Sequence, residues 1–219
     1  ASCSCLCAAG PPDMAVGQSV RSCARITRHT GDASTAHEAG TVFIAGNAIE
    51  LVAAGAGDGP KQTLSRIFDA HTTDKEVYEA EVAPLLDHLI EGCNISVLVA
   101  GNHRSGHAPL FNTLATAAAE RLLERMQQLQ LTSERLALKY HLGVRYAAVI
   151  LGSEQMNDLL SGASTELRVV LDAESPGGVS IPGITTQMLS QPGAFTELLR
   201  VGRTRLGQQG RGPPLSSIL

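Results

Sequence analysis

The residues with the clearest capacity for chemistry lie in one short stretch of the chain. In order they are Gly101, Asn102, His103, Arg104, Ser105, Gly106, His107 and Ala108. The two glycines have the spacing of a phosphate-binding loop, G-x-x-x-x-G-K-[ST], in which backbone N–H groups and a helix N-terminus hold the phosphates. His107 replaces the lysine that reaches the outer phosphates, and Ala108 replaces the hydroxyl that coordinates Mg²⁺. The pattern predicts a vestigial nucleotide site at residues 101–108, with no catalytic residue and at most weak binding of ATP and Mg²⁺.

The segments on either side of this loop are those that would position it. Residues 95–100 form an apolar run that is long enough for a buried parallel strand and too short for a helix. From Leu110 to Gln130 the chain is rich in alanine and helical in pattern, and Pro109 suits a first helical turn. The residues expected on the buried stripe of this helix are Leu114, Ala118, Leu122, Met126 and Leu129.

Other chemical groupings are weaker. His103 and His107 have the i, i+4 spacing of zinc ligands, but they flank a loop glycine and have no third ligand nearby, so no metal site is predicted. Glu154 and Asp158 are interpreted as a solvated cap or a solvated surface pair, because acid–base work would need burial that shifts a pKa. No Ser-His-Asp or Cys-His arrangement is evident.

Composition narrows the class of protein. The chain has 219 residues, 3% aromatic residues and a net charge of −4, which gives no basic surface for nucleic acid. No apolar run approaches the length of a membrane span. Helical patterns alternate with short apolar runs, such as 42–45, 49–52 and 64–68, which predicts an α/β fold with a mainly parallel sheet flanked by helices.

The segment before the loop resembles a known family. Residues 77–94 are similar to the first motor helix of kinesins, V-Y-x-x-x-x-x-P-L-V-x-x-x-L-x-G-Y-N. Residues 94–108 then align without a gap with the kinesin run that ends in G-Q-T-G-S-G-K-T. Further likenesses to kinesin strands, a loop and a helix occur at residues 64–69, 154–160, 167–171, 178–184 and 195–203.

This resemblance implies the N-terminal half of a P-loop NTPase-like motor domain that is truncated before switch I and lacks switch II. Kinesins carry R-x-R-P, whose residues flank the adenine, and Arg25 is the one arginine that this sequence keeps from that motif. Arg25 therefore joins residues 101–108 as a vestigial nucleotide-binding residue. Residues 174–189, which the resemblance places near tubulin in motors, contain no lysine or arginine.

The expected organisation is a disordered segment at 1–18, a partial kinesin-motor-like domain at 19–205 and a flexible tail at 206–219. Because the resemblance takes the sheet neighbours of strand 95–100 from sequence beyond switch I, that strand would lack partners. The chain is expected to be marginally stable, to self-associate, or to rearrange so that other strands close the gap.

Two functional hypotheses follow. The first is a non-catalytic, kinesin-like pseudo-motor that serves as a cytoplasmic, cytoskeleton-associated scaffold. Its expected partners are proteins, either microtubules or a kinesin-like dimer partner, with no nucleic acid and no membrane. The second is a weak nucleotide-binding kinesin-like ATPase or a fragment of a microtubule motor, so whether the chain is an enzyme stays open, with the negative answer favoured.

Overall fold

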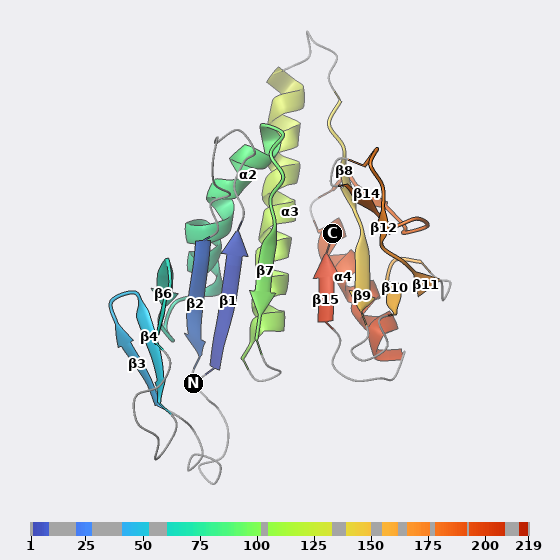
Figure 1. Ribbon diagram of the computed structural model, residues 1–219. Helices are drawn as coiled ribbons and strands as arrows, with labels where there is room; N and C mark the ends of the chain where they lie inside the picture. The colour runs from blue at the N-terminus through green and yellow to red at the C-terminus, as the bar shows by residue number, and fades with distance from the viewer. Residues whose placement is uncertain are drawn as a thin grey trace. The chain divides into compact units, whose positions relative to one another are not determined.

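The computed structural model describes residues 2–8, 21–27, 41–52, 61–101, 105–132, 139–149, 155–161, 166–175, 178–191, 193–208 and 215–218. Strands β1 to β6 come first along the chain, and helices are then interspersed with the remaining strands (Figure 1). The chain divides into two compact units, residues 1–118 and 119–219, and each is described by itself.

The main sheet of the first unit has the strand order β6-β2-β1-β7. Its strands are β1 (Ser2–Ala8), β2 (Arg21–Thr27), β6 (Arg66–Phe68) and β7 (Val97–Ala100). β2 and β6 are parallel, whereas β1 is antiparallel to both β2 and β7. Three of the four strands therefore run in one direction, and β1 runs against them (Figure 1).

Strand β1 bears on two of the expectations. Residues 1–18 were expected to lack structure; within them the structure describes Ser2–Ala8 as a strand that pairs with β2 over seven residues and with β7 over four. The pairing depends on contacts with residues far along the chain, which local composition does not reveal. The strand leading into the loop thus gains a neighbour from the N-terminus, as in the rearranged alternative.

A second sheet contains β3 (Thr41–Ala45), β4 (Ala48–Val52) and β5 (Lys61–Thr63), all antiparallel. The strands expected at 42–45 and 49–52 are confirmed as β3 and β4. Gly46 joins them with a φ of 60°, a conformation that glycine adopts without steric cost. The buried Ala24, Ile49 and Leu64 form a small core here.

The expected first motor helix is confirmed, but it has three parts. They are α1 (Asp74–Val77), the π-helical turn η2 (Tyr78–Val82) and α2 (Ala83–Ile90). A capping box starts α1, because Thr73 accepts a hydrogen bond from the Glu76 N–H and the Glu76 carboxylate accepts one from the Thr73 N–H. The wider turn precedes Pro84, which has no N–H to donate and would crowd the preceding turn of a regular α-helix.

The long helix α3 (His107–Thr132) confirms the helix expected at 110–130. Its buried residues, however, are Leu110, Leu114, Ala119 and Leu123. Of the expected stripe only Leu114 is buried, and the other four residues are half-buried. Each residue advances an α-helix by about 100°, so the five-residue step after Leu114 turns the buried face by about 140°. A constant four-residue step therefore does not describe this helix.

The second unit contains a sheet of order β11-β10-β9-β15, two two-stranded sheets, β14-β8 and β12-β13, and a helix. The sheet strands are β9 (Tyr146–Val149), β10 (Met156–Asp158), β11 (Glu166–Leu167) and β15 (Leu215–Ile218). The pairs are formed by β8 (Leu142–Val144), β12 (Val170–Leu171), β13 (Val179–Ser180) and β14 (Gln187–Leu189), and the helix is α4 (Ala194–Gln208).

The pairing of these strands differs from that of the first unit. All strand pairs described in this unit are antiparallel, whereas β2 and β6 of the first unit pair in parallel. Within residues 206–219, which were expected to form a flexible tail, the structure describes Leu215–Ile218 as a strand that pairs with β9. Among the residues described, no helix is long and apolar enough to cross a membrane.

Candidate nucleotide site

The predicted loop lies between the expected strand and the expected helix. Gly101 follows β7 directly, Ser105 and Gly106 form a turn, and α3 begins at His107. Asn102, His103 and Arg104 lie outside the described residues. The strand–loop–helix order that a phosphate-binding loop requires is therefore confirmed.

The loop is closed on itself by a hydroxyl and an imidazole. Ser105 is 1% exposed, and its Oγ lies 3.1 Å from Nδ1 of His107. A Cβ atom added to Gly101 would lie 2.0 Å from that same Oγ. Only glycine fits at position 101 while the Ser105 side chain keeps this position. The imidazole that replaces the expected lysine is thus in contact with the loop's own side chain.

The backbone features of an anion cradle are present. Gly106 has a φ of 72°, in the left-handed region that favours glycine, and the Leu110 N–H donates to its carbonyl oxygen over 3.1 Å. The 26-residue helix α3 begins at the next residue, so its first N–H groups and its dipole are directed toward the loop. Ala108 is exposed in this first turn and offers only a methyl group.

Strand register brings Arg25 level with the loop. Arg25 pairs with Ser4 of β1, while Ala100 pairs with the adjacent Cys5, so Gly101 comes level with Ser4 from the other side. Two strand spacings separate the backbones of Arg25 and Gly101, roughly 10 Å. Both residues lie toward the carboxyl ends of strands that run in the same direction, which is where open α/β sheets bind ligands.

The Arg25 guanidinium is engaged within the protein. It forms an ion pair with Asp74 at the start of α1 and donates a hydrogen bond from Nη2 to the Thr72 carbonyl oxygen over 3.0 Å. Its Nε is buried and has no hydrogen-bond partner among the residues that the structure describes. In this arrangement Arg25 fixes α1 against β2, and its charge is already compensated by Asp74.

The described part of the loop can therefore do less than a complete phosphate site. Backbone N–H groups at the start of α3 suit an anion, but neither the Ala108 methyl nor the His107 imidazole replaces the hydroxyl ligand of Mg²⁺. Within the described residues, no group of three or more His, Cys, Asp or Glu side chains could hold a metal ion. The residues fit a phosphate better than they fit its metal ion.

Sequence reasoning was wrong about Asp158. It lies in β10 and is 4% exposed, so it is not a solvated surface residue; Glu154 lies outside the described residues. Its Oδ1 accepts hydrogen bonds from the N–H groups of Leu160 and Ser161, and its Oδ2 accepts one from that of Thr185. Burial alone would raise the pKa of this carboxyl, but these bonds and one from the Thr185 hydroxyl outweigh burial and hold the pKa below its usual range.

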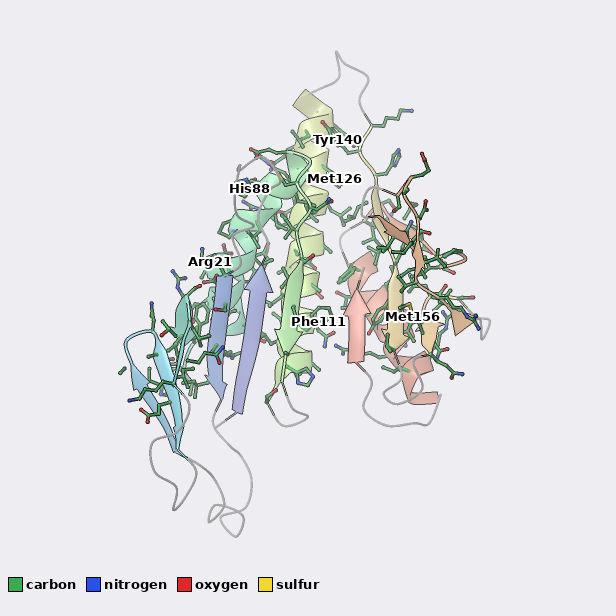
Figure 2. The ribbon with its side chains drawn as sticks, in the orientation of Figure 1. Arg21, His88, Phe111, Met126, Tyr140 and Met156 are labelled. Atoms are coloured by element: carbon green, nitrogen blue, oxygen red, sulfur yellow. The ribbon has the colours of Figure 1, made fainter. Side chains whose placement is uncertain are left out.

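Sequence reasoning also missed a buried carboxylate on the π-helical turn. The Glu81 side chain is 1% exposed and lies 3.3 Å from the guanidinium groups of both Arg21 and Arg66. Figure 2 labels Arg21, which is the first residue of β2. Burial, followed by the charge of Glu81, raises the pKa of the buried Cys23 thiol to about 12, which leaves this cysteine unreactive at neutral pH. The two arginines are far apart in sequence, so spacing gave no signal for this cluster.

Comparisons with known proteins agree with this frame. The kinesin motor domain family matches residues 49–209. Kinesin-like protein KIF22 of Rattus norvegicus is 32% identical over 164 residues, which are 68% of this chain and 24% of that protein. Kinesin-like protein KIN-UB of Oryza sativa subsp. japonica is 27% identical over 144 residues, 64% of this chain and 15% of that protein. The chain thus spans about a quarter or less of the length of these relatives.

A solved structure of KIF14 with ADP in complex with a microtubule covers 83% of this chain at 19% identity, with a TM-score of 0.63. The match extends over 54% of that chain. A structure of a KIF14 dimer with AMP-PNP on a microtubule covers the same share, with a TM-score of 0.60 and 18% identity. These similarities confirm the P-loop NTPase-like α/β fold class, and with the family match over residues 49–209 they show that the chain belongs to the kinesin motor domain family.

Proposed function

We propose that this chain is a non-catalytic kinesin-motor-like module that acts as a protein-binding scaffold in the cytoplasm, associated with the microtubule cytoskeleton. The observation that carries the proposal is the contact between His107 Nδ1 and Ser105 Oγ at the start of α3. At this position a nucleotide-hydrolysing loop has a lysine that extends to the outer phosphates. An imidazole is shorter, and here it is directed at the loop's own hydroxyl.

The loop does not offer the side-chain ligand that Mg²⁺ needs. In loops that bind it, Mg²⁺ bridges the outer phosphates and neutralises the charge that develops on them. Its ligand from the loop is a hydroxyl at the position of Ala108, which has none. A loop that lacks both the lysine and the metal ligand has lost the two contacts that accelerate phosphoryl transfer, so the proposal assigns no catalytic residue.

A second candidate function is weak nucleotide binding. It is supported by the left-handed Gly106, the N–H groups at the start of α3 and the position of Arg25 level with Gly101. A phosphate held by these groups alone would have no lysine contact. Charge-assisted hydrogen bonds contribute about 1.5–3 kcal/mol each, so losing one weakens binding roughly tenfold to a hundredfold.

Calorimetric titration of the chain with ATP and Mg²⁺ separates these candidates. The scaffold proposal predicts a dissociation constant weaker than about 1 mM and phosphate release no faster than in buffer. The double substitution His107→Lys and Ala108→Thr should gain affinity that is lost on addition of EDTA, because it restores the charge and the metal ligand to an existing cradle. Phosphate release should stay at the buffer rate, since neither new side chain orients an attacking water molecule.

The two single substitutions are the matched controls. His107→Lys alone should bind ATP without dependence on Mg²⁺, and Ala108→Thr alone should bind no better than the unmodified chain. Tight binding of Mg-ATP by the unmodified chain would refute the scaffold proposal in favour of a nucleotide-binding protein. If the double variant gains nothing while remaining folded, the backbone cradle itself is not functional.

The proposed association with microtubules can be tested separately. KIF14, a structural neighbour, is seen in complex with a microtubule and as a dimer, which supports microtubules or a kinesin-like dimer partner as candidates for this chain. Cosedimentation with microtubules should give the same bound fraction with ADP, with AMP-PNP and without nucleotide. A bound fraction that changes with nucleotide would show that the loop still controls the protein, contrary to the proposal.

A further inference from the structure

The strand pair β12-β13 exposes apolar side chains to solvent. Leu171 is 92% exposed, and its neighbours Val169 and Val170 are 55% and 39% exposed. Val179, which pairs with Leu171 across the two strands, is 45% exposed. Directly paired residues in a sheet project to the same face, so Leu171 and Val179 form one apolar surface. We call Val169, Leu171 and Val179 the hairpin patch; Val170 projects to the opposite face of the two strands.

The hairpin patch is held by an organised turn. The Ser175 N–H donates to the Asp172 carbonyl oxygen, and the Gly178 N–H donates to that of Ser175. The Ser175 hydroxyl donates to the Val179 carbonyl oxygen over 2.7 Å. Neither β12 nor β13 has a second neighbour among the described strands, so both have an edge to which an extended peptide could add. A leucine exposed to this degree on such an edge favours a partner over an isolated surface.

The charge around the hairpin patch indicates the kind of partner. Residues 169–191 contain two acidic residues, Asp172 and Glu174, and no lysine or arginine, although Arg168 immediately precedes them. Asp172 follows β12 directly, and Glu174 lies two residues further along the chain. An acidic protein surface would be repelled here, whereas a segment that combines apolar and basic side chains would match both the apolar surface and the carboxylates.

We propose that the hairpin patch binds an extended segment of another protein in which apolar residues alternate with lysine or arginine. The apolar side chains would cover Leu171 and Val179, the basic ones would face Asp172 and Glu174, and the backbone would add to a free strand edge. This proposal rests on the scaffold function proposed above and names the chemistry of one of its partners.

The test uses the full chain and three short synthetic peptides. One alternates valine with lysine, one alternates serine with lysine, and one alternates valine with glutamate. Fluorescence anisotropy should show binding of the valine–lysine peptide that weakens as salt is raised, and no comparable binding of the other two.

Paired substitutions then locate the binding surface. Leu171→Ser combined with Glu174→Lys should weaken binding of the valine–lysine peptide by at least about tenfold. The matched control, Leu131→Ser with Glu124→Lys, makes the same chemical changes at exposed positions on α3, where Leu131 is 74% exposed, and should leave binding unchanged. Because all four side chains are exposed, both variants should keep the circular dichroism spectrum of the unmodified chain.

Four results would overturn the proposal. They are no binding of the valine–lysine peptide, equal binding of the serine–lysine peptide, equal loss of binding in both double variants, and self-association of the chain that the Leu171→Ser, Glu174→Lys variant abolishes. Microtubule cosedimentation is measured on the same variants. Loss of microtubule binding in the hairpin variant alone would assign the surface to an acidic partner instead, whereas unchanged cosedimentation with failed peptide binding refutes this inference and leaves the scaffold proposal intact.

Discussion

Replacing Asp158 by asparagine tests how much the hydrogen bonds of this carboxylate contribute to the stability of the second unit. Asparagine keeps an acceptor at the Oδ1 position, so the Leu160 and Ser161 N–H groups retain their partner. At the Oδ2 position it places an NH₂ group that cannot accept from the Thr185 N–H, now 2.7 Å from Oδ2. One charge-assisted hydrogen bond is lost and a buried donor is left unpaired, which together cost about 2–4 kcal/mol.

Hydrogen exchange and denaturant unfolding measure this cost. In exchange governed by local opening, 2–4 kcal/mol corresponds to a loss of protection at the Thr185 amide of roughly 30- to 700-fold. Asp172→Asn is the matched control. Asp172 Oδ1 accepts from the Glu174 N–H in an exposed turn, and asparagine can do the same, so the change should be about 0.5 kcal/mol or less.

The lowered pKa of Asp158 also determines how its contribution to stability changes with pH. Because the folded-state pKa of Asp158 lies below its unfolded value, its contribution to stability is fully present above the ordinary aspartate pKa. It is lost as the pH falls through the lowered value in the folded protein. The difference in unfolding free energy between the native chain and Asp158→Asn should therefore be constant near neutral pH and shrink in acid. A difference below about 0.5 kcal/mol at neutral pH, or one that grows in acid, would refute the reasoning.

Two further predictions concern buried sites in each unit. Gly202→Ala in α4 would place a Cβ atom 2.2 Å from the ring of the buried Tyr146. The overpacking cost of about 1–3 kcal/mol should exceed the gain of about 1 kcal/mol in helix propensity, so denaturant unfolding should show net destabilisation. An unchanged unfolding midpoint would mean that the ring moves aside. Glu81→Gln should lower the pKa of the Cys23 thiol from about 12, while burial keeps that pKa above the ordinary cysteine value. The ¹³Cβ chemical shift of Cys23, measured as a function of pH, follows this pKa. An unchanged pKa would show that Glu81 does not act on the thiol.

Local patterns predicted some of this molecule and not the rest. The strand expected at 95–100 is present over Val97–Ala100, and the loop glycines and the helix follow it as expected, because these segments have strong periodicity or turn chemistry. β1 and β15 were missed because a short strand in a small-residue or Gly/Pro-rich segment is defined by its partners, which lie far away in the sequence.

The local parts of the candidate site were predictable from the sequence, and its long-range contacts were not. The positions of Gly101, Ser105, Gly106 and His107 follow from spacing, because the loop is a local structure. The engagement of Arg25 with Asp74 depends on the packing of α1 against β2, which spacing along the sequence does not reveal.

The antiparallel strand β1 has a consequence for how the chain folds during synthesis. β1 and β2 are close in sequence and can pair early, but β7, the other neighbour of β1, is made only about ninety residues later. Until then the free side of β1 is an open edge on a nascent chain, and such edges recruit other chains. The phosphate-binding loop follows β7, so its frame is complete only after this late pairing. The rate at which the ribosome reaches residue 100, relative to encounters with other unfinished chains, should therefore set the yield of folded protein.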